Sequence, residues 1–377
     1  MEVHVHPSLE NIAEADWNAL HRPADTPFLD YRFLRGLELT SCVGERAGWI
    51  PHHLTFHDEG RLVAAAPAYI KLNSEGEFVF DWGWADAAER AGIQYYPKLV
   101  VAVPFTPATG TRLLVAEGVD RALLYRTFAK ALRQLFEEET FLSSVHVLFT
   151  EDDLTRAFAA EDYLVRFGLQ YHFENPGFST FEDFLATMPT KRRTQIRRER
   201  RRPSEDGITI RTLAPTELTP EIARTMHRIY LTTVDKFAWG RRYLNAKFFG
   251  HLAAHQPEAQ RWVVAERDGA ILAGAVNVGG EGVLYGRYWG AFEELPFLHF
   301  ATCYYHGIDE CIMHGLRRFE PGAGGEHKRP RGFNPAKTRS VHLIRNPHLS
   351  DAIAEFLARE RTSIDRLLAQ DAEERGV

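Results

Sequence analysis

The stretch Glu320-Pro-Gly-Ala-Gly-Gly-Glu-His-Lys328 combines the end of a strand, a glycine loop and reactive side chains. It follows a strand-like run at residues 316–319 and leads into Arg331-Gly-Phe-Asn-Pro335. Glycines let a polyphosphate or an acyl chain approach main-chain N–H groups closely. The loop also gathers acid, base and anion-binding groups. These groups are Glu326, His327, Lys328 and Arg331. The alternative is a surface turn whose charges are solvated.

Length and composition place the chain among ordinary globular proteins. Its 377 residues favour two domains, and 45% hydrophobic with 25% charged residues is a normal globular composition. No apolar run approaches the roughly 20 residues of a membrane helix, and the N-terminus lacks the pattern of a signal peptide. Three cysteines form neither an even disulfide framework nor a metal-binding pair. We therefore expect a cytoplasmic protein that is not an integral membrane protein.

Positive charge is concentrated in residues 191–202, which hold eight basic residues and one acid although the whole chain is net −6. Such a segment predicts an anionic partner, namely cofactor phosphates, tRNA or an anionic lipid headgroup. The alternative is a solvated helix between domains. No aromatic residue is interleaved with the basic ones, so base stacking has no local support and DNA is not an expected partner.

Hydrophobic periodicity predicts alternating strands and helices in the first half. The predicted helices cover residues 8–20, 31–40 (with Asp30 as N-cap), 121–139 and 152–167, the last closed by Gly168. The predicted strands cover residues 53–57, 61–71, 77–81, 98–103 and 144–149.

The second half repeats this order. Predicted helices cover residues 220–237, 244–255, 296–315 and 350–370; predicted strands cover 208–213, 261–268, 270–279 and 283–289. Two successive units of similar order predict a duplicated mixed α/β fold. We expect an N-terminal domain at 1–175, a C-terminal domain at 176–345 with a basic entry helix at 190–202, and a C-terminal helix at 346–377 that packs back on the first domain.

Several runs resemble a known family. They are residues 76–82, 95–99, 103–112, 191–200, 284–290, 298–300, 303–305, 325–328 and 331–333. With them the chain resembles, over roughly residues 26–345, the FemAB-like N-acyltransferases, which carry the label peptidoglycan biosynthesis/recognition. The resemblance implies two tandem GNAT (acyl-CoA N-acyltransferase) domains, each a mixed, mostly antiparallel sheet flanked by helices.

The same resemblance implies an enzyme that moves an acyl group from acyl-CoA to a small-molecule or lipid amine, with the acceptor site in the cleft between the domains. Acyl-CoA would be a donor substrate, and no tightly bound cofactor is expected. Three alternatives stay open: an aminoacyl-tRNA-dependent Fem-type transferase acting on a cell-wall precursor, acylation of a long-chain sphingoid amine, and a non-catalytic recognition protein. The family usually has an acid where this chain has Ala301 and a glutamine where it has Gly324, which keeps the last alternative open.

The predicted catalytic groups surround the glycine loop. Glu320 and Glu326 are the candidate acids or bases, and His327 is the candidate imidazole. Tyr288 is the tyrosine we assign to the leaving thiolate; Tyr285, Tyr304 and Tyr305 are alternatives, and all four could instead be core residues. The predicted donor-binding groups are Arg287 and Gly290, a partial match to the pyrophosphate turn [QR]-x-x-G-x-[GA], with Gly325, Lys328 and Arg331.

The predicted substrate-binding groups lie in both halves. Asp81, Trp82, Tyr95 and Tyr96 form an aromatic wall with one carboxylate, suited to a sugar or an amine, and we expect a perturbed pKa for Asp81. The alternative is a hydrophobic seam. His299 and Tyr305 are further substrate contacts. A helix face carries His299, Cys303, His306 and Glu310, but ligands on one helix cannot surround a zinc ion, so no metal is expected.

Overall fold

The chain forms two compact units and passes between them inside two long strands. The computed structural model describes residues 1–236 and 241–375. The first unit comprises Met1–Leu169 with Lys337–Val377, and the second comprises Gln170–Ala336. The crossings lie in β9 (Leu164–Glu174) and β15 (Asn334–Ile344). The boundaries expected at 175 and 345 therefore fall just after these two strands.

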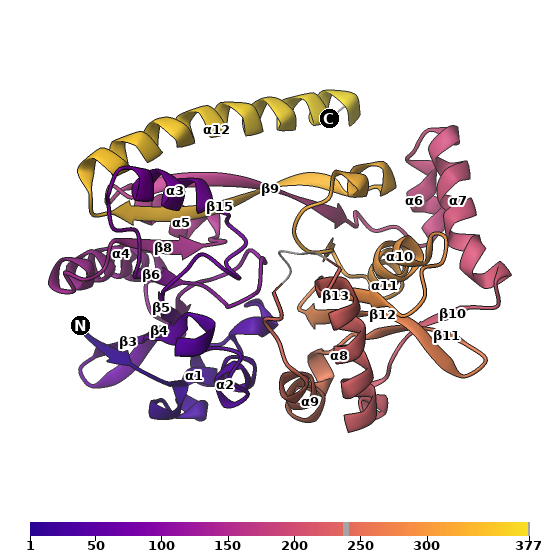
Figure 1. Ribbon diagram of the computed structural model, residues 1–377, viewed down its shortest axis with the longest axis horizontal. Coiled ribbons are helices and arrows are strands. Elements are labelled where there is room, and N and C mark those ends of the chain that lie inside the picture. The colour runs from indigo at the N-terminus through magenta and orange to yellow at the C-terminus, as the bar shows by residue number, and fades with distance from the viewer. Residues whose placement is uncertain (237–240, 376–377) are drawn as a thin grey trace. The chain divides into compact units, whose positions relative to one another are not determined.

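The first unit is built from mixed α and β elements, which Figure 1 shows in indigo to magenta with the C-terminal helix in yellow. They are β1 (Glu2–His6), a 3-10 turn (Leu9–Asn11), α1 (Glu14–Leu20), a 3-10 turn (Pro27–Leu29), α2 (Tyr31–Leu39), a 3-10 turn (Glu45–Ala47), β2 (Trp49–Pro51), β3 (His53–Asp58), β4 (Arg61–Ala66), β5 (Ala68–Lys71), α3 (Trp82–Arg90), β6 (Lys98–Val101), β7 (Leu114–Val115), α4 (Arg121–Glu138), β8 (Ser144–Leu148), α5 (Asp152–Ala159) and α12 (Pro347–Arg375).

One of the two sheets of this unit contains a parallel pair of strands. One sheet has the order β1-β3-β4-β7, and the other contains the order β15-β8-β6-β5-β2. β5 and β6 are antiparallel, whereas β6 and β8 are parallel with Leu99 opposite Val145. Parallel neighbours need a crossover connection, and α4 lies in the segment that joins them.

Helix α4 has the amphipathic pattern that the sequence predicts. The Asp120 side chain accepts a hydrogen bond from the Leu123 N–H and so caps the first turn. Leu124, Phe128 and Leu132 recur every four residues and are buried in the main core of the unit. The predicted Asp30 cap of α2 is also confirmed, since its side chain accepts from the Arg32 N–H.

Helix α12 packs within the first unit, where Figure 1 shows it beside α3 and β15. Its buried Leu349, Ile353 and Leu357 contact Trp84 of α3 in a small core. Outside that core, the Arg166 guanidinium of β9 binds the Glu360 carboxylate at 2.9 Å. In the described part of the chain, no helix combines the length and the apolar character needed to span a bilayer.

The second unit repeats the mixed architecture. Its elements are α6 (Phe181–Ala186), α7 (Thr190–Glu205), β10 (Thr209–Thr212), a 3-10 turn (Pro215–Glu217), α8 (Pro220–Val234), α9 (Ala246–His255), a 3-10 turn (Pro257–Ala259), β11 (Val263–Arg267), β12 (Ala270–Gly280), β13 (Val283–Ala291), α10 (Leu298–Phe300), a π-helical turn (Ala301–Tyr305), α11 (His306–Met313), β14 (Arg318–Glu320) and a 3-10 helix (Glu326–Arg331). The predicted end of the helix at Phe237 lies outside the described residues.

The sheet of the second unit follows the order β10-β11-β12-β13-β14-β9. β11, β12 and β13 form an antiparallel meander, and the turn at Asp268-Gly269 has positive φ at both residues, as a tight hairpin requires. β13 and β14 are parallel and are joined through α10 and α11. Both units therefore contain an antiparallel pair followed by a helical crossover to a parallel strand.

Two predicted elements are wrong. The helix expected at 152–167 ends at Ala159, and Leu164 begins β9, because aromatic and β-branched residues pair better in a sheet. Gly168 lies inside β9 and does not end a helix. A Cβ there would lie 2.6 Å from Oγ1 of Thr338, so this position needs glycine for close packing. The strand expected at 77–81 is an irregular loop with positive φ at Phe78 and Phe80.

Two helices also differ from their predicted form. Helix α3 was not predicted, because its first residues, Trp82-Gly-Trp84, had indicated only an aromatic wall. The helix expected at 296–315 begins at Leu298, after Phe297 in the left-handed region, and contains the π-helical turn. Such turns are frequent at functional sites.

Candidate functional site

Glu320 is a buried carboxylic acid at the end of β14. Tyr285 is its partner in the parallel register, and β14 ends here whereas β13 continues to Ala291. The side chain of Glu320 is almost fully buried, and its Oε2 has no hydrogen-bond partner in the described structure. The nearest cation is Nη1 of Arg318, 3.5 Å from Oε1.

The surroundings of Glu320 keep its proton affinity high. Burial raises the pKa of Glu320 to about 7, although the Arg318 guanidinium opposes this shift. Nε2 of His172 lies 3.9 Å from Oε2 of Glu320, and burial with the charges of Arg318 and Lys328 lowers the His172 pKa to about 3. The imidazole is therefore neutral at pH 7. Glu320 is the kind of acid that can exchange a proton near neutral pH.

The predicted donor-binding residues Arg287 and Gly290 lie inside β13 and do not form a turn. Burial lowers the pKa of the Arg287 guanidinium, although the negative charge of Glu320 acts in the opposite direction. A Cβ at Gly290 would come 1.9 Å from the Ile229 carbonyl oxygen of α8, so this glycine serves strand–helix contact. Tyr288 packs its ring 4.9 Å from that of Tyr230, also on α8. Residues 287–291 therefore form strand and not a turn, and the role of Arg287 and Gly290 in donor binding stays a prediction.

Lys328 fastens the glycine loop. Its buried ammonium group donates to the carbonyl oxygens of Gly322 at 2.6 Å and Ala323 at 3.3 Å. Burial lowers the Lys328 pKa to about 8. Gly325 precedes the 3-10 helix at φ +90°, and a Cβ there would lie 2.6 Å from the His327 ring. Lys328 therefore has a structural role in the loop, whether or not it also meets a ligand.

Glu326 and His327, which are neighbours in sequence, have different surroundings. Glu326 is exposed and makes no hydrogen bond or ion pair with any described residue. Nε2 of His327 lies 2.8 Å from the Tyr304 hydroxyl, and burial with the charges of Lys328 and Arg331 lowers the pKa of His327. Among the predicted catalytic residues, Glu326 therefore lacks the buried environment that Glu320 has.

His299 belongs to an aromatic cluster beside His327. Its ring lies 4.9 Å from Trp289, 5.1 Å from Tyr304 and 6.2 Å from His327. Burial and the nearby His327 lower the pKa of His299 to about 4, so this imidazole is neutral at pH 7. The structure therefore places the rings of His299 and His327 in one aromatic cluster.

Arg331 is held by protein groups and does not offer a free guanidinium. Its Nε and Nη2 bind the two carboxylate oxygens of Glu199 at 3.0 and 3.1 Å, and its Nη1 donates to the His327 carbonyl. The guanidinium also lies 3.4 Å from the centre of the Phe300 ring. The Tyr305 hydroxyl donates to Glu199 as well. The bidentate pair with Glu199 gives Arg331 a structural role, and its contact with donor phosphates stays a prediction.

Glu199 was missed because it lies in the basic run. On α7 it shares a buried face with Ile196 and Pro203, and this spacing of three and four residues was the signal in the sequence. Four of the eight basic residues of α7 form ion pairs. These pairs are Arg197–Glu182, Arg200–Asp309, Arg201–Glu205 and Arg202–Asp206. Lys191, Arg193 and Arg198 form no ion pair with a described acid and remain available to an anion.

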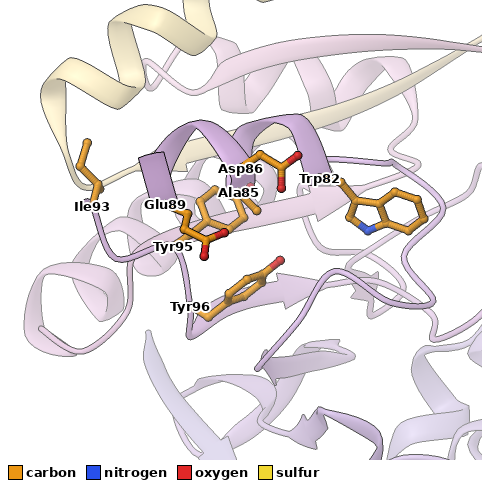
Figure 2. Close-up of a pocket in the computed structure, with 7 residues that line it drawn as sticks. All are labelled: Trp82, Ala85, Asp86, Glu89, Ile93, Tyr95 and Tyr96. Atoms are coloured by element: carbon orange, nitrogen blue, oxygen red, sulfur yellow. The ribbon is translucent and has the colours of Figure 1, made fainter. Parts of the chain in front are cut away.

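The aromatic wall of the first unit is a pocket. Trp82, Tyr95 and Tyr96 line a hollow of about 490 Å³, which Figure 2 shows together with Asp86 and Glu89 of α3. Asp81 does not line it. The Asp81 carboxylate is buried, binds the Lys98 ammonium and accepts a hydrogen bond from the Tyr95 hydroxyl at 2.6 Å.

Charge pairing decides the protonation of Asp81. Burial alone would raise its pKa, but the Lys98 ammonium prevails and holds the pKa well below its usual range. The Lys98 ammonium also lies 2.9 Å from Oε2 of Glu77. The expected perturbation of Asp81 is present, and it makes the carboxylate a permanent anion below the pocket.

The positions that depart from the family pattern lie in the second unit. Ala301 is buried in the π-helical turn and lines a pocket of about 190 Å³ with Tyr305 and Arg200. Gly324 is exposed at φ +71°. In the described parts of the chain, no group of three or more His, Cys, Asp or Glu side chains could hold a metal ion.

Solved structures share the fold at low sequence identity. FemX has a TM-score of 0.53 at 11% identity and covers 94% of this chain and 100% of its own. The C-terminal domain of a putative lysylphosphatidylglycerol synthetase from Agrobacterium fabrum gives 0.54 at 12%, covering 92% and 95%. L-PGS from Bacillus licheniformis gives 0.51 at 11%, covering 85% and 95%. A search of curated proteins returns no match.

The family comparison agrees with the fold. The model of the FemAB-like family, described as peptidoglycan biosynthesis/recognition, matches residues 8–376. The mixed α/β fold of this chain is shared with the three solved structures named above. Family and fold together support an acyl or aminoacyl transferase in general. The chain belongs to the FemAB-like family.

Proposed function

We propose that the protein transfers an acyl group from the thioester of an acyl-CoA to an amine, with Glu320 as the base that takes the proton of the attacking nitrogen. The observation that carries the proposal is the buried, incompletely hydrogen-bonded carboxyl of Glu320 with a pKa of about 7. A general base is most effective when its pKa lies near the working pH. Perturbed carboxyls of this kind concentrate at functional sites.

The step balances with Glu320 as the only protein base. The amine nitrogen attacks the thioester carbonyl, the C–N bond forms, and the nitrogen passes its proton to the Glu320 carboxylate. The C–S bond then breaks and the thiolate of CoA leaves, to be protonated by solvent. Burial of Glu320 serves this step because the carboxylate is a stronger base in a site that hydrates it poorly.

A second candidate is transfer from an aminoacyl-tRNA, in which the bond that breaks is the ester C–O bond. It is favoured by the unpaired basic residues of α7, Lys191, Arg193 and Arg198, since nucleic acid binding depends on contacts to phosphates. The names of the similar structures, FemX and lysylphosphatidylglycerol synthetase, are compatible with it. The same base, Glu320, would serve either donor.

The test is a thiol-release assay with acyl-CoAs of several chain lengths and a mixture of small-molecule and lipid amines. We expect release with the wild type and a loss of about 10²- to 10⁴-fold in Glu320→Gln, which keeps the shape but cannot accept a proton. Glu281→Gln is the matched control, because Glu281 lies on an exposed turn.

The outcome separates the two donors. Absence of thiol release with every acyl-CoA, together with nuclease-sensitive transfer from aminoacyl-tRNA, would replace the first donor by the second. Full activity of Glu320→Gln with either donor would remove Glu320 from the chemistry.

A further inference from the structure

The pocket beside α3 in the first unit has the features of a site for an organic cation. The pocket is lined by Trp82, which keeps 52% of its surface exposed, and by Tyr95 and Tyr96. Figure 2 shows the Tyr96 ring and the Trp82 indole at the same cavity as the carboxylates of Asp86 and Glu89.

The free charges of the pocket are negative. Asp86 and Glu89 are three residues apart on α3 and so lie on neighbouring positions of one helix face. Both are exposed, and neither makes a hydrogen bond or ion pair with a described residue. Both acids line the same pocket as the aromatic side chains.

The cation below the pocket does not oppose a positive ligand. The Lys98 ammonium lies 5.6 Å from the centre of the Tyr96 ring, but it is bound to Asp81 and to Glu77. The Tyr96 hydroxyl is fixed by a 2.7 Å hydrogen bond with Oγ of Ser74. The Lys98 charge is therefore balanced by its two carboxylate partners, and the net charge that a ligand meets comes from Asp86 and Glu89.

We propose that this pocket binds an alkylammonium group of a small ligand, which the Trp82 and Tyr96 rings contact through cation–π interactions and the two carboxylates hold by charge. Aromatic faces attract cations, and carboxylates at the rim exclude anions and favour a cation over a neutral isostere. The binding does not depend on the proposed acyl transfer. Its failure would leave the role of Glu320 untouched.

The test uses the full-length protein labelled with 5-fluorotryptophan and ¹⁹F NMR. The Trp82 resonance is assigned through Trp82→Phe, and n-butylammonium chloride is the probe, with n-butanol as the neutral isostere. We expect a saturable shift of the Trp82 resonance with butylammonium. The double variant Asp86→Asn/Glu89→Gln should weaken it about tenfold, a change of the size that two exposed ion pairs contribute.

Two controls keep the test decisive. Glu14→Gln/Asp16→Asn removes the same charge from exposed positions of α1 and should bind the probe within about twofold of the wild type. Raising NaCl should weaken binding to the wild type, because salt screens exposed charges; this needs no variant. Butanol shifting Trp82 as strongly as butylammonium, salt-independent binding, an unaffected Asp86/Glu89 variant, or no saturable shift would each overturn the proposal.

Discussion

Two carboxylates of the second unit, Glu199 and Glu320, are equally buried but differ in their partners. Glu199 receives bonds from Arg331, from the Tyr305 hydroxyl and from Nε2 of Gln195 at 2.8 Å. Glu320 has a single-point contact with the Arg318 guanidinium at 3.5 Å and an oxygen without a hydrogen-bond partner in the described structure. Burial raises the pKa of Glu320 to about 7.

This difference indicates a structural role for Glu199 and fits the proposed catalytic role of Glu320. A buried ion pair with all its hydrogen bonds holds α7 to the segment that follows the glycine loop, although 132 residues separate Glu199 from Arg331. A buried acid left partly unsatisfied costs stability, and proteins keep such groups where chemistry needs them.

The largest expected effect is on folding. Glu199→Ala leaves the Arg331 guanidinium buried without its counter-charge, and we expect the free energy of unfolding to fall by about 3–5 kcal/mol. Urea denaturation followed by circular dichroism measures it, with Glu281→Ala as the control. A loss below about 1 kcal/mol would show that the pair does not support the fold.

Glu320→Gln should change stability in the opposite direction at high pH. The folded-state pKa of Glu320 is raised, so the folded protein binds an extra proton between the usual pKa of 4.5 and about 7, and the wild type loses stability as pH rises through this window. Glutamine cannot ionise and avoids that loss. We expect the variant to be more stable than the wild type by about 1–3 kcal/mol at pH 8.

The pH dependence supplies the control for this variant. At pH 4 both side chains are neutral, and the two proteins should unfold at similar urea concentrations. A variant that is less stable than the wild type at pH 8 would mean that the Glu320 carboxylate is stabilised by its surroundings, contrary to the contrast drawn here.

Tyr305→Phe tests a single bond of the structural acid. The variant removes the hydroxyl that donates to Glu199 while Arg331 remains bound. A hydrogen bond to a charged group contributes about 1.5–3 kcal/mol, so the loss should be smaller than that of Glu199→Ala. Equal losses in the two variants would assign the effect to the tyrosine and not to the ion pair.

The smallest effect is expected at Glu326, a third acid of the same unit that is exposed. Glu326→Ala should leave the unfolding midpoint unchanged, because surface substitutions away from special features do little. Thiol release should also persist if Glu320 is the base. A loss of turnover as large as that of Glu320→Gln would return the chemistry to the glycine loop.

Local signals in the sequence were sufficient for much of the fold. The cap at Asp30, the apolar stripe of α4 and the turn at Asp268-Gly269 are formed by residues close in sequence, and the structure has them. Glu320 was identifiable as an acid between a strand and three glycines. The structure adds its burial, and its catalytic role stays a prediction.

Long-range contacts defeated the remaining expectations. No residue close to Glu199 in sequence indicates its pairing with Arg331. A glutamate among arginines is typical of an exposed helix, and only its spacing from Ile196 indicates that it is buried. Gly290 matched a local motif, but contact with α8 determines its surroundings. Asp81 was predicted to belong to the aromatic wall. Its ion pair with Lys98 was not predicted, because the two residues lie 17 positions apart in sequence.

The most direct measurement is a titration of Glu320 itself. Infrared difference spectra between the wild type and Glu320→Gln, recorded from pH 4 to 10, isolate the carboxyl band of this residue. We predict that the protonated band persists at pH 6 and disappears with a midpoint of about 7. A midpoint near the ordinary value of 4.5 would contradict the account, because Glu320 would then be a solvated acid without special proton affinity.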